Sequence, residues 1–164
     1  MSKIKTTYIF GNKKNISKLD SNENIIIDTN EYSNYFIFRK FYDIISHKNF
    51  NKDSTYFIFE FSNNLFIEVF FRPLNKYITI STTNGIDILI DGNSDKLSYE
   101  YTIIDDYIDI FDEFINNFYQ VDNQVKELHR YLTLFITYLN HNYFKYTIIS
   151  LPDNINYIPD GNYA

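Results

Sequence analysis

The chain has 164 residues and a formal net charge of −6, and 45% of its residues are apolar. This length and apolar content fit one folded domain and exclude an intrinsically disordered chain. There is no cysteine, which excludes disulfides, thiolate nucleophiles and zinc sites built from cysteine.

The first residues carry lysines but no apolar leader segment, so we predict no signal peptide. The longest uncharged stretch, residues 131–144, is too short and too polar to span a bilayer. We therefore expect a cytoplasmic protein that does not associate with membranes.

The first third of the chain predicts two strands and a helix. Residues 3–10 have strand composition, residues 11–24 are polar and predict a loop, and residues 25–28 predict a short strand. Apolar residues recur at helical spacing over residues 31–47, which predicts an amphipathic helix. The aromatic and β-branched content of that segment leaves a strand as the alternative.

The middle of the chain predicts an antiparallel meander. Residues 54–61 and 65–72 are strand-like and flank a turn signal, so we expect them to form a hairpin. Residues 77–82 and 86–90 flank Asn84-Gly85, which suits a tight type I′ turn. A further strand is predicted over residues 98–103.

A helical region and a last strand follow. Ten apolar residues keep an unbroken alternation of four- and three-residue steps: Tyr107, Phe111, Phe114, Phe118, Val121, Val125, Leu128, Leu132, Phe135 and Leu139. One helix of this extent would be about 50 Å long at the usual rise per residue. The alternative is two helices meeting near Asp122-Asn123, and both remain open. Residues 144–151 predict a strand.

These elements predict an α+β fold: an antiparallel β-sheet meander with helices packed on it, including one or two long C-terminal helices. We expect a single domain over residues 1–164, in which residues 152–164 form an extended C-terminal tail.

Motifs of catalysis are missing from the chain. It has no nucleophile elbow, no phosphate-binding glycine loop and no zinc-binding His-Glu-x-x-His sequence. The histidines at 47, 129 and 141 have no histidine partner three or four residues away. We therefore expect no cofactor, no metal and no catalytic residue, and an enzyme is the less favoured class of protein.

Two glutamates interrupt apolar strands. In the predicted hairpin Glu60 and Glu68 point to opposite faces, which argues against a pair of catalytic carboxylates. A small enzyme or ligand-binding protein that uses either of them with His129 remains a third hypothesis. The same hairpin is apolar on both faces, so either helices cover both faces or one face docks a partner or a second copy.

Charge is unevenly distributed. Residues 87–113 hold nine acidic residues and one lysine, for a net charge of −8, whereas residues 1–18 hold five lysines and no acid. An acidic helical face is predicted, and we expect nearby tyrosines to contribute to a partner-binding surface. Its residues are Asp105, Asp106, Asp109, Asp112 and Glu113, with Tyr99, Tyr101 and Tyr107. The acidity disfavours nucleic acid as a partner.

In outline, a small acidic cytoplasmic α+β protein with an aromatic sheet resembles immunity proteins that neutralise bacterial toxins. It is equally similar to phage or viral proteins that inhibit host factors. This resemblance rests on no specific residue and transfers none. It implies a non-enzymatic protein that binds and occludes another protein with a basic surface. The alternative is a homo-oligomeric structural protein, such as a homodimer, that uses an apolar sheet face.

Overall fold

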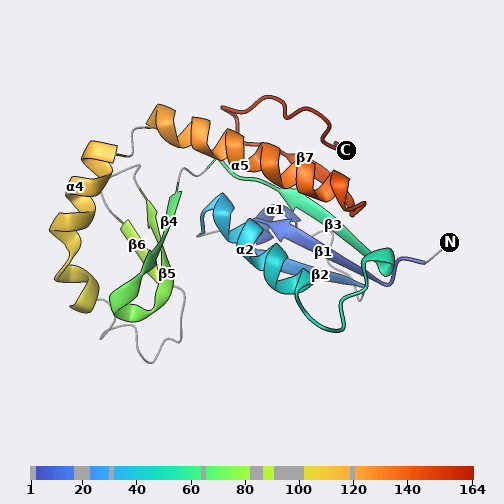
Figure 1. The fold of residues 1–164 in the computed structure, drawn as a ribbon, viewed down its shortest axis with the longest axis horizontal. Coiled ribbons are helices and arrows are strands. Elements are labelled where there is room, and N and C mark those ends of the chain that lie inside the picture. Colours follow the sequence, from blue (N-terminus) through green and yellow to red (C-terminus); the bar gives the residue numbers. More distant parts are fainter. Residues whose placement is uncertain are drawn as a thin grey trace.

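The computed structural model describes residues 3–16, 23–29, 32–63, 66–81, 87–90, 102–118 and 121–164. Two sheets organise these residues (Figure 1). The first has four strands in the order β2-β1-β3-β7, and all three neighbouring pairs are parallel. Its strands are β1 (Thr6–Gly11), β2 (Asn24–Asp28), β3 (Thr55–Glu60) and β7 (Lys145–Ser150).

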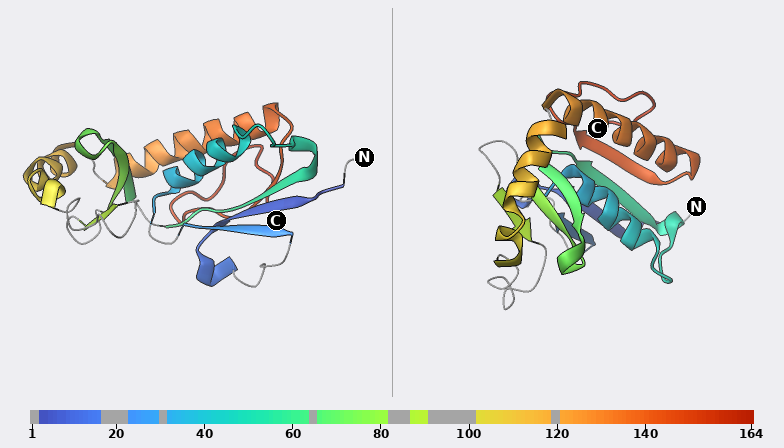
Figure 2. Two further views of the ribbon diagram at one scale, coloured as in Figure 1. Left: turned by 90° about the horizontal axis from the view of Figure 1, so that it is seen from below. Right: turned by 60° about the vertical axis from the view of Figure 1, so that its left-hand side comes forward.

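Helices cover the two faces of the parallel sheet unequally. The long helices α2 (Asn34–Ile45) and α5 (Val121–His141) lie together over one face, and the short helix α1 (Lys13–Ile16) lies on the other (Figure 2). A 3₁₀ turn at Lys52–Ser54 leads into β3. Because each parallel strand must be reached by a crossover, helices between the strands follow directly from this topology.

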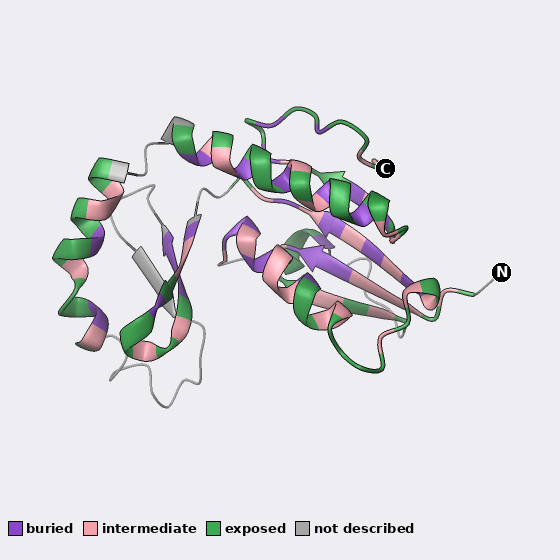
Figure 3. Cartoon of the chain, in the orientation of Figure 1, coloured by how far each residue is buried: buried purple, intermediate pink, exposed green. Residues whose placement is uncertain are grey.

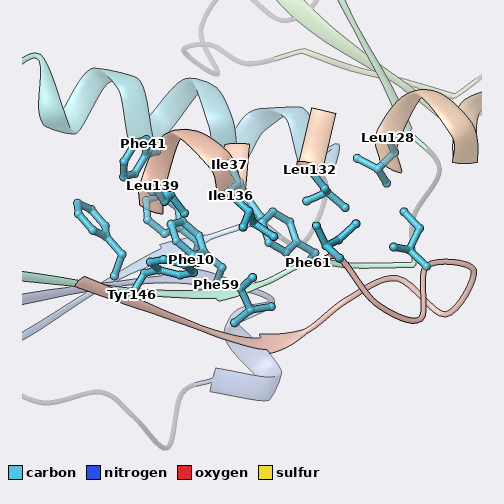
Figure 4. Packing of buried hydrophobic residues seen from close by; sticks show 14 residues of the cluster. Phe10, Ile37, Phe41, Phe59, Phe61, Leu128, Leu132, Ile136, Leu139 and Tyr146 are labelled. Carbon is cyan, nitrogen blue, oxygen red and sulfur yellow. The ribbon is translucent and has the colours of Figure 1, made fainter. Parts of the chain in front are cut away.

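The main core fills the space between the sheet and the two long helices. Side chains from β1, β3 and β7 meet those of α2 and α5, as Figure 4 shows. Its most deeply buried members are Phe10, Ile37, Phe57, Phe59, Phe61, Leu132, Ile136, Leu139 and Ile158. Buried and half-buried residues alternate along β3, which is the two-residue period of a strand with one face packed on helices.

The second sheet is antiparallel and has the order β4-β5-β6. Its strands are β4 (Phe66–Phe71), β5 (Lys76–Ser81) and β6 (Asp87–Ile90), and a 3₁₀ turn at Arg72–Leu74 joins the first two. Helix α4 (Ile108–Phe118) packs on one face and closes a separate, smaller core. The chain enters this part after β3 and returns through α5 to the parallel sheet (Figure 1).

The predicted fold class is wrong in its central feature, because the four-stranded sheet is parallel. The hairpin of residues 54–61 and 65–72 does not exist: β3 pairs with β1 and β7, and β4 pairs with β5 in the other sheet. Strands inside a parallel sheet covered by helices read as continuous apolar runs, and β3 is such a strand. Residues 54–61 and 65–72 are close in sequence but belong to different sheets.

Several elements agree with the prediction. Helix α2 lies within residues 31–47, and β5 and β6 pair antiparallel with Ser81 opposite Asp87. The C-terminal helical region consists of two helices, since α4 ends at Phe118 and α5 begins at Val121. Residues 102–105 form a helical turn rather than the end of the strand predicted over residues 98–103. The rest of that segment and Asn84-Gly85 lie outside the described residues.

Residues 152–164 fold back against the main core. Ile155 and Ile158 are buried there, and the hydroxyl of Tyr163 bonds both backbone groups of Ile158 at 2.7 and 2.9 Å. The backbone N–H of Ile148 donates to Asn162, and that of Ala164 donates to Ile148. The end of the chain thus covers the outer edge of β7, where an open strand edge would otherwise attract further strands.

Candidate functional site

The predicted acidic surface lies on α4 and on the turn that precedes it. Asp109, Asp112 and Glu113 belong to the helix and Asp105 and Asp106 to the turn, and all five residues are exposed (Figure 3). The spacing of Asp109, Asp112 and Glu113 places these three on one side of the helix, with Asn116 one turn beyond Asp112. We call this set of five carboxylates the acidic face.

Packing on the opposite side of α4 fixes the direction of the acidic face. Ile104 and Phe111 are buried against the antiparallel sheet, where the ring of Phe111 lies 5.4 Å from that of Phe71. The ring of Tyr107 meets Phe71 edge to face at 5.3 Å. Rotation of α4 about its axis would expose this apolar stripe to water, so the carboxylates are held outward.

The acidic face is not neutralised by the part of the chain that the structure describes. None of its five carboxylates forms an ion pair with a described residue, and the amide of Asn116 contacts Asp112 only at 3.5 Å. At its margin Ile110 is 61% exposed, and Glu113 follows it by one helical turn. Tyr107 is also exposed. Tyr99 and Tyr101 lie outside the described residues.

A groove of about 480 Å³ lies where α2, α5 and the antiparallel sheet meet. Its lining is mostly aromatic and carries three charged side chains. The residues are Tyr35, Phe38, Arg39, Tyr42, Ile67, Glu68, Tyr77, Glu127 and Tyr131. We call it the aromatic groove. This volume falls within the usual range of small-molecule sites, about 300–1,000 Å³.

An ion pair forms one wall of the aromatic groove. Arg39 Nε on α2 lies 3.0 Å from Glu68 Oε1 on β4, and the Glu68 side chain is only 6% exposed. The guanidinium of Arg39 lies 4.9 Å from the ring of Tyr77 and 5.3 Å from that of Phe36. A buried carboxylate needs a charged partner, and here α2 supplies it across the boundary between the two sheets.

The glutamates singled out in the sequence do not meet in one site. Glu60 lies at the end of β3, where its Oε1 accepts from the backbone N–H of Asn12 at 3.1 Å. Glu68 belongs to the other sheet and binds Arg39. His129 is exposed on α5 and is not among the residues that line the aromatic groove with Glu68. The structure therefore offers no support for a shared catalytic role.

The aromatic strands have different partners from those expected. Phe57, Phe59 and Phe61 face α2 and α5 in the main core, so helices cover this surface. On β4 and β5, Phe70 and Tyr77 remain exposed as an edge-to-face pair 5.1 Å apart. That pair adjoins the aromatic groove, which Tyr77 also lines.

Of the residues that line the aromatic groove, the sequence singled out Glu68 alone, and it did not place Glu68 in a groove. The two glutamates of α5 and β4 and the arginine of α2 lie far apart in the chain, and only the tertiary fold assembles them. A weak signal existed: Arg39 is one of three arginines, and Tyr35 and Tyr42 recur at a helical interval of seven. Such spacing places both tyrosines on the same side of α2.

Comparison with models of known protein families, with curated proteins and with solved structures finds no match for this chain. None of the described helices combines the length and the apolar content that crossing a bilayer requires. Over the same residues, no group of three histidine, aspartate or glutamate side chains is gathered as a metal would need.

Proposed function

We propose that this protein is a non-enzymatic inhibitor or binding protein that docks a basic surface of another protein through the acidic face of α4. The observation that carries the proposal is Ile110, a large apolar side chain left 61% exposed beside carboxylates that have no described ion-pair partner. An isolated exposed isoleucine would need no explanation. One bordered by a dense set of like charges has the anatomy of an interface, an apolar contact with a polar rim.

The charges and the apolar side chain would serve different steps of binding. The acidic face attracts a positively charged partner over a distance and speeds association. Ile110 and the edge of Tyr107 would then lose water against the partner and slow dissociation. Like charges packed this densely also repel one another, and a basic partner would relieve that repulsion.

The position of α4 suits this role. It lies at one end of the long axis of the molecule, and the N-terminal end of β1 lies near the other (Figures 1 and 2). Lys3 and Lys5, just before β1, therefore lie far from the acidic face of α4, and this separation of charge would orient the protein as it approaches a basic target. Inhibition by occlusion follows, in the manner of immunity proteins or phage and viral inhibitors. We place this action in the cytoplasm, since a chain without cysteine gains nothing from an oxidising compartment.

The test compares two variants with the same change in net charge. Asp109→Lys with Asp112→Lys alters the acidic face, and Glu23→Lys with Asp43→Lys alters exposed acids near the parallel sheet. Each protein is immobilised and used to capture partners from a lysate of its source, and the partner retained by the unaltered protein is then purified for kinetics.

We expect the α4 variant to slow association by about tenfold or more at low salt and to weaken its salt dependence. Ile110→Ala should instead raise the dissociation rate, because the apolar contact forms after encounter. An equal loss of association rate in the Glu23 and Asp43 variant would show that only total charge matters and would overturn the proposal. So would unchanged kinetics in the α4 variant.

A homo-oligomer is the second candidate, and one observation favours it. Phe70 and Tyr77 form an exposed aromatic pair on the face of the antiparallel sheet opposite α4. A second copy would cover this pair in a homodimer. Light scattering at two protein concentrations tests this candidate. A molar mass of two chains for the unaltered protein, and of one chain for Phe70→Ser, would support the dimer. The mass of one chain at both concentrations would exclude it.

A further inference from the structure

We propose that the aromatic groove binds a guanidinium group, presented as an arginine side chain on the surface of a polypeptide partner. This site is separate from the acidic face of α4, and the inference does not rest on it. The groove already contains one arginine, Arg39.

The contacts of Arg39 show how residues of the groove bind a guanidinium group. Arg39 lies over the ring of Tyr77 at 4.9 Å and donates to Glu68 at 3.0 Å. Ring faces carry partial negative charge and attract a cation, and the carboxylate completes the neutralisation. The charges of Arg39 and Glu68 neutralise each other, so this part of the groove does not favour a charged ligand.

The part of the groove that α5 supplies repeats the same kinds of group without a described cation. Glu127 and Tyr131 are one helical turn apart on α5 and both line the groove. The ring of Tyr131 meets that of Tyr35 edge to face at 5.4 Å, which holds its orientation. Glu127 forms no ion pair with any described residue. Two carboxylates against one guanidinium give the groove lining a net charge of −1.

This arrangement selects the charge and shape of the ligand. An anion would meet ring faces and an uncompensated carboxylate, so a cation is favoured. A planar guanidinium can stack on Tyr131 and direct N–H groups to Glu127 at once, which a compact ammonium cannot do as well. Arg39 already lies over a tyrosine ring of the same groove, that of Tyr77, in the manner proposed for the ligand.

The openness of the groove indicates where the guanidinium comes from. Tyr42 is 67% exposed and Tyr131 is 43% exposed, although both line it. Small-molecule sites usually enclose about 70–90% of the ligand surface. A shallow groove leaves room for a backbone above it, which suits a side chain projecting from a partner rather than a free small cation.

The probes are capped tripeptides, acetyl-Gly-X-Gly-amide, in which X is arginine or its neutral isostere citrulline, together with methylguanidinium. Binding is measured on the full chain by NMR, from the shifts of ¹³C-labelled tyrosine rings. We expect saturable binding of the arginine peptide and at least about threefold weaker binding of the citrulline peptide and of methylguanidinium. Equal binding of the arginine and citrulline peptides would overturn the need for positive charge. Equal binding of methylguanidinium would overturn the polypeptide source.

Variants locate the site and separate ring chemistry from folding. Tyr131→Phe keeps a ring face and should bind within about twofold of the unaltered chain, whereas Tyr131→Leu should weaken binding about threefold or more. Glu127→Gln should also weaken it by about threefold or more, and Glu23→Gln, an exposed glutamate near β2, should not. Thermal melting checks that each variant is folded. Binding that survives in both Tyr131→Leu and Glu127→Gln would place the cation elsewhere and overturn the assignment.

Discussion

The side-chain amide of Asn34, at the start of α2, makes two hydrogen bonds with the backbone of Ser62, just beyond β3. Its Nδ2 donates to the Ser62 carbonyl at 3.0 Å, and its Oδ1 accepts from the Ser62 N–H at 2.8 Å. The amide thus satisfies both backbone groups of a residue that leaves the sheet. Because Asn34 is buried, no water could replace these bonds without rearrangement.

Asn34→Asp should therefore destabilise the fold strongly. The carboxylate still accepts from the Ser62 N–H but cannot donate, so the Ser62 carbonyl would face a negative charge. We expect the free energy of unfolding to fall by about 1–3 kcal/mol or more, since an unsatisfied buried polar group costs about that much and a charged one costs more. Urea unfolding measures it, with the exposed Asn154→Asp as the control. Equal stability of both variants would contradict the role of the amide.

The contact of Arg39 with Glu68 should behave as a coupled pair. Arg39→Met leaves a buried carboxylate without this partner, and we expect a loss of about 2–4 kcal/mol, reduced from the fully buried case because Arg39 is partly exposed. Glu68→Gln should cost less, since a neutral amide still accepts from Arg39. The double variant should be more stable than the sum of the two losses implies. A double-mutant cycle in urea tests this, and strict additivity would show that the pair is not coupled.

Neutralising the acidic face should leave the fold intact. Asp112→Asn with Glu113→Gln removes two exposed charges beyond the first turn of α4, where the helix dipole contributes little. Repulsion between like charges at helical spacing also falls, so we expect a melting temperature equal to or slightly above that of the unaltered chain. Asp109→Asn, in the first turn, should lower stability by about 0.3–1 kcal/mol. A large loss in the first variant would mean that these carboxylates stabilise the fold.

Stability should fall at high pH through Tyr146. Burial raises the pKa of the Tyr146 hydroxyl above its ordinary value of 10.0. The folded state then holds this proton more tightly than the unfolded chain does. This difference contributes to the free energy of unfolding. The contribution is fully present below the pKa that Tyr146 has in the unfolded chain, and it is lost as pH rises through the pKa that Tyr146 has in the folded protein.

Tyr146→Phe tests this dependence. The variant loses the hydrogen bond to Asn140 Oδ1 at 2.7 Å, so it should be less stable near neutral pH. Its stability should nevertheless decline less steeply above about pH 10 than that of the unaltered chain. Urea unfolding at several pH values provides both slopes, with the exposed Tyr143→Phe as control. Parallel slopes for Tyr146→Phe and the unaltered chain would contradict the assignment.

At Gly11, strand β1 lies too close to Glu60 of β3 for a side chain to fit without a shift. A Cβ atom at this position would lie 2.9 Å from Cβ of Glu60, on the neighbouring strand. Gly11→Ala should force β1 and β3 apart locally and disturb the bond from the Asn12 N–H to Glu60. We expect a loss of about 1–3 kcal/mol, as for other overpacked sites. Glu60→Gln keeps an acceptor for Asn12 and serves as the comparison, with a smaller loss expected. An unchanged melting temperature for Gly11→Ala would contradict the close contact.

Local patterns in the sequence predicted individual elements well. The helical spacing around Ile37 and Phe41 anticipated α2, and the acidic repeat from Asp105 to Glu113 anticipated an exposed face of α4. Each of these two predictions needs only the sequence of one segment. In a helix at the protein surface, the apolar residues face the core and the charged residues face water. The pairing of β5 with β6 followed from short-range alternation in the same way.

Strand partners and the aromatic groove could not be predicted in this way. The apolar run of β3 suits a parallel sheet covered by helices as well as a hairpin, and only packing against α2 and α5 decides between them. Likewise nothing along the chain connects Arg39 or Glu127 with Glu68, although Glu68 stands out because it interrupts an apolar strand.

By itself the sequence determined which residues form most helices and strands, where negative charge gathers and that no familiar catalytic motif is present. Those properties depend on neighbours a few residues apart. The tertiary structure alone decided that β3 lies between β1 and β7, and that an arginine of α2, a glutamate of β4 and a glutamate of α5 line one groove. These relationships join segments far apart in the chain, and the burial of apolar surface that brings them together is a property of the whole fold.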